Sequence, residues 1–135
     1  MAYKLSSRSL GRMEGIDERM IEVVKVAIEH TKIDFGVTQG LRTIEEQEKL
    51  VAAGASKTMK SKHIDGLAVD LMAYVDGRGC WELNVYDEIA DAMKIGAAQC
   101  DVPIRWGAAW HIADIREWDG TMEDAMNDYV DTRRS

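Results

Sequence analysis

Residues 67–74 read LAVDLMAY, an apolar run that contains one carboxylate, Asp70. Its length and composition predict a central β-strand, and strand alternation places Asp70 within an apolar surrounding. A carboxylate there costs on the order of several kcal/mol unless it is hydrogen-bonded, paired or bound to a metal. Asp70 therefore needs a partner, which is either a metal ion or an arginine, with Arg42 and Arg105 as the candidates.

His63 precedes this strand in the sequence and is separated from it by Gly66. Glycine adopts the positive φ values that would fold the loop back, and the small Ala68 leaves space, so the imidazole and the Asp70 carboxylate can converge. One nitrogen and one oxygen ligand of these types suit Zn²⁺. The alternative is that Asp70 forms an ion pair with an arginine and that His63 only lies on a loop.

The other elements follow from periodicity and from capping signals. Apolar residues at helical spacing predict a helix over 18–30, and alternation predicts a strand over 33–38. Thr43 and Glu46 have the spacing of a capping box, which predicts a helix that ends at Gly54. Further expected elements are a turn at 76–79, a helix from Asn84, a short strand over 102–107 and a helix over 121–132. This order predicts an α+β fold in one domain, residues 1–135.

The charge balance excludes one class of partner. The 135 residues have a net charge of −7 and a pI near 4.9, which argues against binding of nucleic-acid backbone by general electrostatics. Residues 111–135 contain seven acids and three bases, so we interpret them as an acidic helical insertion or tail. No apolar run approaches the ~20 residues that span a membrane, and the first residues do not resemble a signal peptide. We expect no membrane insertion and a cytoplasmic site of synthesis.

A five-position pattern, Ser-x-His-x-x-Gly-x-Ala-x-Asp, is complete at Ser61, His63, Gly66, Ala68 and Asp70. It resembles the zinc-site signature of the D-alanyl-D-alanine carboxypeptidase and L-alanyl-D-glutamate endopeptidase family. This family includes VanY-type enzymes and phage endolysins that cut the stem peptide of peptidoglycan. Supporting matches at 39–43, 46–47, 103–107 and 110 extend the resemblance over about residues 15–110, and it is closest to the short phage lysis enzymes.

The resemblance implies a small antiparallel sheet flanked by helices, the fold of hedgehog- and DD-peptidase-like zinc peptidases. It implies that His63 and Asp70 bind Zn²⁺, that Ser61 lies in the site and that Arg42 clamps a substrate carboxylate. Two further residues, Trp106 and Trp110, are expected to contact substrate. The implied protein is a monomer, made without a signal peptide in the host cytoplasm, that acts on bacterial peptidoglycan after release.

The sequence departs from the family pattern near its C-terminus. The third zinc ligand of the family is a histidine in an Asp-x-x-His element, and no histidine follows His111. Three interpretations stay open: the chain ends before that element; His111 is the third ligand, with Asp114, Glu117 or Asp119 as the base; or the site is degenerate.

Two main functional hypotheses follow. The first is a zinc-dependent endopeptidase of phage endolysin type that hydrolyses the L-Ala–D-Glu amide of the stem peptide. The alternative is a non-catalytic cell-wall-binding or regulatory module with the same fold. A metal-free globular protein, in which Asp70 is paired with an arginine, is a third possibility.

Overall fold

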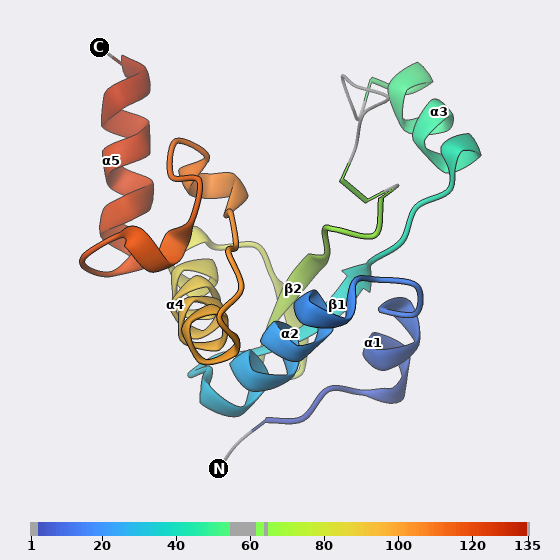
Figure 1. The fold of residues 1–135 in the computed structure, drawn as a ribbon, viewed down its shortest axis with the longest axis horizontal. Helices are drawn as coiled ribbons and strands as arrows, with labels where there is room; N and C mark the ends of the chain where they lie inside the picture. The colour runs from blue at the N-terminus through green and yellow to red at the C-terminus, as the bar shows by residue number, and fades with distance from the viewer. Residues whose placement is uncertain (1–2, 55–61, 64, 135) are drawn as a thin grey trace.

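The computed structural model describes residues 3–54, 62–63 and 65–134 (Figure 1). The helices are α1 (Ser7–Arg12), α2 (Glu18–His30), α3 (Ile44–Ala52), α4 (Leu83–Cys100) and α5 (Met122–Arg134). The strands are β1 (Asp34–Gln39), β2 (Asp70–Val75) and β3 (Arg78–Cys80). Two short 3-10 helices, η1 (Gly107–Ala109) and η2 (Ile115–Glu117), lie between α4 and α5.

The three strands form one antiparallel sheet in the order β1-β2-β3. The run at 67–74 therefore supplies the central strand, as predicted, although β2 begins only at Asp70. Asp76 and Gly77 connect β2 to β3 with φ values of 54° and 78°, the left-handed conformation of a two-residue hairpin turn. The α+β class and the small antiparallel sheet are both confirmed.

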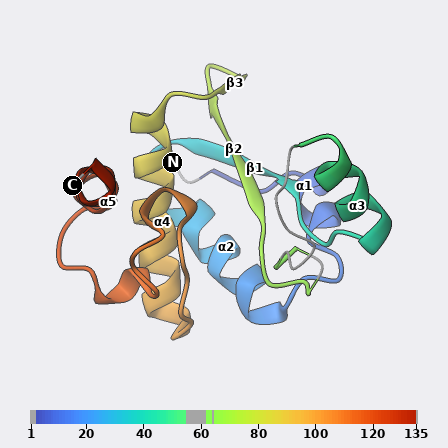
Figure 2. The ribbon, with the colours of Figure 1, turned by 90° about the horizontal axis from the view of Figure 1, so that it is seen from above.

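Helices α2 and α4 pack side by side and supply much of the core (Figures 1 and 2). Asp17 caps α2 by accepting a hydrogen bond from the Arg19 backbone N–H, and four apolar residues of α2 are fully or almost fully buried: Val23, Val24, Ala27 and Ile28. A Cβ atom at Gly96 would lie 2.6 Å from the Val23 carbonyl oxygen. The absence of a side chain at Gly96 thus allows the close approach of α4 to α2.

Helices α3 and α5 lie at opposite ends of the molecule (Figures 1 and 2). The predicted capping box begins α3: the Thr43 side chain accepts from the Glu46 N–H, and the Glu46 carboxylate accepts from the Thr43 N–H. Helix α5 packs against α4 and η1, and its first residue, Met122, is fully buried. The acidic segment predicted as an insertion or tail is therefore docked on the core.

The prediction of a strand over 102–107 is wrong. Val102 and Ile104 are buried and Pro103 and Arg105 are exposed, so the alternation is real, but in the part of the chain that the structure describes this segment joins no sheet. Its Ile104 carbonyl instead accepts a hydrogen bond from the N–H of Ile115 (2.8 Å). Helix α1, which the sequence analysis did not predict, packs against β1.

No helix among the described residues is long and apolar enough to cross a membrane.

Candidate active site

The ends of β1 and β2 bring the predicted site together. Gln39, the last residue of β1, is the register partner of Asp70, the first residue of β2. The segment that follows β1 therefore meets the segment that precedes β2, and the Arg42 N–H donates to the His63 carbonyl (2.9 Å). Gly66, with φ of 72°, turns the chain between His63 and the strand, as the sequence predicts.

His63 and Asp70 face each other. The Nε2 atom of His63 lies 3.4 Å from Oδ1 of Asp70, and Nδ1 lies 2.9 Å from the Gly40 carbonyl oxygen. Because a carbonyl oxygen only accepts, we assign the hydrogen to Nδ1, which leaves Nε2 directed at Asp70. The hydrogen bond to Asp70 raises the pKa of His63, and partial burial of the ring opposes this rise.

Asp70 also has an arginine partner. Its Oδ2 atom lies 3.9 Å from Nη2 of Arg42, so the pairing with His63 and the pairing with Arg42 exist together. The expectation that Asp70 lies inside an apolar strand is wrong, because it is the first residue of β2 and its side chain is 52% exposed. Arg105, the other candidate partner, forms no ion pair with Asp70.

Arg42 is buried, with an exposed fraction of 8%. Its Nη1 atom donates to Oε1 of Gln47 (2.6 Å) and its Nη2 atom to Oε1 of Gln39 (2.7 Å). Gln47 is fully buried. The roles of both glutamines were not predicted from the sequence, where they stand only as matches around Arg42, although a glutamine on the buried face of a helix is itself a signal of a polar partner.

A groove of about 690 Å³ runs beside Asp70. One wall is formed by residues 67–71, another by the segment 102–107 with Trp110, and the groove also contacts an apolar face of α4. Trp106 and Trp110, the predicted substrate contacts, therefore line the same groove as Asp70. Ser61 lies outside the described residues.

His111 is held elsewhere. Its Nε2 atom lies 2.8 Å from Oδ2 of Asp128, and its ring stacks on Tyr129 with a centroid distance of 5.1 Å. Both partners belong to α5, the helix farthest from α3 in Figure 1. Within residues 3–54, 62–63 and 65–134, no group of three His, Cys, Asp or Glu side chains is placed to hold a metal ion. The structure thus does not bring His111 to His63 and Asp70.

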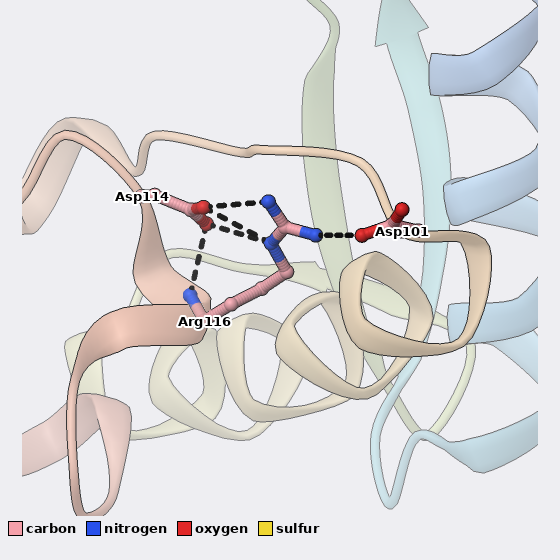
Figure 3. A network of polar contacts seen from close by, with 3 residues as sticks. All are labelled: Asp101, Asp114 and Arg116. Carbon is pink, nitrogen blue, oxygen red and sulfur yellow. Dashed lines mark hydrogen bonds and ion pairs between the residues drawn. The ribbon is translucent and has the colours of Figure 1, made fainter.

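Asp114, the candidate base, is also engaged elsewhere (Figure 3). Both of its oxygens accept from Arg116, at 3.0 Å and 3.1 Å from Nε and 2.8 Å from Nη2, and Arg116 reaches on to Asp101 at the end of α4 (2.7 Å). Hydrogen bonding from Arg116 holds the pKa of Asp114 below its usual value. Asp114 does not line the groove; it anchors η2 to α4.

A small antiparallel sheet and a histidine–aspartate pair, of which Asp70 lines the groove, agree with the class of peptidase that the Ser61–Asp70 pattern predicts. The model of the family described as phage L-alanyl-D-glutamate peptidase matches residues 1–130. The chain belongs to this family.

Two relatives agree with this assignment. The chain is 28% identical over 115 residues to the L-alanyl-D-glutamate peptidase of Escherichia phage T5, which covers 82% of this chain and 84% of the relative. The crystal structure of the L-Ala D-Glu endopeptidase ChiX of Serratia marcescens superposes with a TM-score of 0.77 at 32% identity. That likeness covers 84% of this chain and 86% of the ChiX chain.

Proposed function

We propose that the chain is a zinc-dependent peptidoglycan endopeptidase of phage endolysin type. It hydrolyses the amide bond between L-Ala and D-Glu of the stem peptide, as the names of the phage T5 and Serratia relatives describe for those proteins. The observation that carries this proposal is the pair formed by His63 Nε2 and Asp70 Oδ1 at the groove, in a chain of this family.

The pair fits zinc in two respects. Zinc–nitrogen and zinc–oxygen bonds of about 2.1 Å at tetrahedral angles separate two ligand atoms by about 3.4 Å, and the separation here is 3.4 Å. The second ring nitrogen of His63 is bonded to a backbone carbonyl, which is the usual outer contact of a zinc-binding histidine. The separation of the two atoms and the outer contact of His63 both support a cation shared by His63 and Asp70.

Zinc at this position would polarise the scissile carbonyl and acidify a bound water molecule. The chain's own groups position the site, and the Gly40 contribution comes from its backbone carbonyl. Gly40 fixes the tautomer and direction of the His63 ring, and Arg42 orients the Asp70 carboxylate from the side away from His63. Trp106 and Trp110 give the groove aromatic walls against which a stem peptide packs, and Ser61 is expected to hydrogen-bond to substrate or to a ligand.

A cleavage assay tests the proposal. Purified bacterial cell wall is incubated with the chain and zinc, and new amino termini are identified. The wild type is expected to release termini at D-Glu, and chelation of zinc or the variant His63→Ala abolishes the release. His30→Ala, which removes an exposed histidine that is hydrogen-bonded to Gln99, serves as the matched control and retains activity.

The second candidate is a non-catalytic wall-binding module, and it is favoured by a specific observation. The described residues supply two ligands rather than three, and a two-ligand site binds zinc far more weakly than a complete one. Under this alternative the chain sediments with cell wall but releases no termini at any zinc concentration. Such a result overturns the endopeptidase proposal.

The remaining expectations belong to the same proposal. The partner is bacterial peptidoglycan, reached from the host cytoplasm after release by another factor, and the acting species is a monomer. Gel filtration of the purified chain tests the last point, since a dimer would elute at twice the mass of 15.1 kDa.

A further inference from the structure

The groove beside Asp70 is lined by two cations, Lys62 and Arg105, that no acidic side chain among the described residues neutralises, and of these Arg105 is the one whose head group is held by contacts with Trp110. The charged residues that line it are Asp17, Arg19, Lys62, Asp70 and Arg105. Arg19 is paired with Asp17 (3.2 Å), and Asp70 is paired with Arg42 and His63. Arg105 forms no ion pair with any residue that the structure describes. In a chain of net charge −7, a fixed and uncompensated guanidinium at this groove indicates an anionic ligand.

Arg105 is held in place without losing its charge. Its Nε atom donates to the Trp110 carbonyl oxygen (2.7 Å), and its Nη2 atom donates to the same oxygen. The guanidinium carbon lies 4.0 Å from the centroid of the Trp110 ring, which is a cation–π contact. Of the five N–H donors of an arginine, these bonds use two. The remaining donors are preorganised, so little side-chain entropy is lost when they bind a ligand.

Arg42, to which the sequence analysis assigned the carboxylate clamp, is placed differently. It is 8% exposed, and its guanidinium is already engaged with Gln39, Gln47 and Asp70. To grip a substrate it would have to abandon buried hydrogen bonds, which costs about 1–3 kcal/mol for each group left unsatisfied. Arg105 is exposed and needs no such rearrangement.

We propose that Arg105 binds the free α-carboxylate of D-Glu in the stem peptide and makes the chain discriminate against peptides in which that carboxylate is amidated. The inference rests on the proposed function. In peptidoglycan the D-Glu residue continues the chain through its γ-carboxyl group, so its α-carboxylate lies on the carbon that bears the scissile nitrogen. The planar fork of an arginine suits this carboxylate because it can donate two parallel hydrogen bonds.

The test compares two synthetic peptides, L-Ala-γ-D-Glu-L-Lys-D-Ala and the same peptide with the α-carboxylate converted to an amide. Binding is measured by calorimetry with a chelator present, so that hydrolysis does not interfere, and kcat/KM is measured separately with zinc. The wild type is expected to bind the acid about tenfold more tightly than the amide. Arg105→Gln is expected to bind both peptides equally, at the level of the amide.

Arg19→Gln is the matched control, because Arg19 lines the same groove but is neutralised by Asp17. It retains the tenfold preference. Arg105→Lys covers the case in which Arg105→Gln does not fold: it keeps the positive charge but loses the fork, and we expect most of the preference to disappear. A folded Arg105→Gln or Arg105→Lys variant that keeps the full preference overturns the proposal.

The outcomes for the wild type separate the two proposals. If the wild type cleaves and binds both peptides equally well, the role of Arg105 is wrong while the endopeptidase function stands. If the wild type neither cleaves cell wall nor binds either peptide, the proposed function itself is wrong, and the role of Arg105 is overturned with it.

Discussion

The Nη2 atom of Arg42 lies 3.9 Å from Oδ2 of Asp70, the carboxylate oxygen that does not face His63. Because Arg42 is almost fully buried and is bonded to two glutamines, it fixes the direction of the carboxylate from within the protein. Asp70 is thus held between a rigid cation and an imidazole. This arrangement suits a positioning role for Arg42 toward the Asp70 carboxylate.

Arg42→Met should weaken zinc binding about 10- to 100-fold, the usual effect of losing an outer contact of a metal ligand. It should also lower the free energy of unfolding by about 1–3 kcal/mol, because the buried Gln47 loses its hydrogen bond with Arg42. Calorimetric zinc titration and urea unfolding measure these effects. The control is Arg78→Met, which replaces an exposed arginine of the β2–β3 hairpin. Unchanged zinc affinity combined with a raised KM for peptide would instead restore Arg42 as a substrate clamp.

Gly40→Ala should disrupt the orientation of His63. A Cβ atom at Gly40 would lie 2.1 Å from the Arg12 carbonyl oxygen, so the backbone must shift, and the Gly40 carbonyl is the acceptor for His63 Nδ1. We expect zinc affinity to fall at least about tenfold, in line with the loss of an outer contact to a ligand. Zinc titration and the ring proton shifts of His63 report the change.

Gly11→Ala is the control for this prediction. Gly11 lies in α1, and a Cβ atom there meets nothing within 4 Å. Alanine at a helical glycine is expected to stabilise by about 0.5–1 kcal/mol, and zinc affinity should not change. Equal zinc affinities in the two variants would show that the Gly40 carbonyl does not orient His63.

Local signals in the sequence predicted much of the fold. The capping box at Thr43 and Glu46, the apolar face of α2 and the apolar run that contains β2 each operate within a few residues, so composition and spacing are sufficient. The segment 102–107 shows the limit of such signals. Its alternation of buried and exposed residues is real, but a strand also needs a hydrogen-bonding neighbour, which no local pattern reveals.

The candidate site also contains one part that a local sequence pattern predicted and another part that depends on tertiary packing. His63 and Asp70 come from one ten-residue pattern, and the structure brings them together. The contacts of Arg42 join Gln47 on α3 to Gln39 at the end of β1, so they depend on how α3 is placed relative to that strand, and the contact of His111 with α5 depends on how that helix docks. Sequence spacing identified Arg42 and His111 as candidate site residues, but it could not predict which side chains they contact.

Asp87→Asn should stabilise the protein near neutral pH. Asp87 is 5% exposed, and burial, followed by the charges of Glu123, Asp91 and Glu88, raises its pKa to about 6 from the usual 3.8 of an aspartate. The folded state therefore favours the protonated form. This contribution to stability is fully present below pH 3.8 and is lost as the pH rises through about 6.

The amide cannot ionise, so the variant should exceed the wild type by up to about 3 kcal/mol at pH 7.5, from a pKa shift of about two units. The two proteins should be nearly equal at pH 4. Urea unfolding across this pH range measures the difference, with the exposed carboxylate replaced in Asp119→Asn as the control. A constant difference between wild type and Asp87→Asn at all pH values would contradict the raised pKa.

His111→Ala tests whether the C-terminal region contributes a ligand. The ion pair with Asp128 is partly exposed and the ring stacks on Tyr129, so its loss should cost about 1 kcal/mol of stability. Zinc affinity should stay within about twofold of wild type. His63→Ala should lower the zinc affinity at least about 100-fold, because the residues that bind the metal directly supply most of the binding free energy. Zinc titration of both variants, with His30→Ala as the control, shows whether His111 is a zinc ligand. A fall of tenfold or more in His111→Ala would mean that α5 releases His111 to complete the metal site, since the docked arrangement holds that ring against Asp128 and Tyr129 instead.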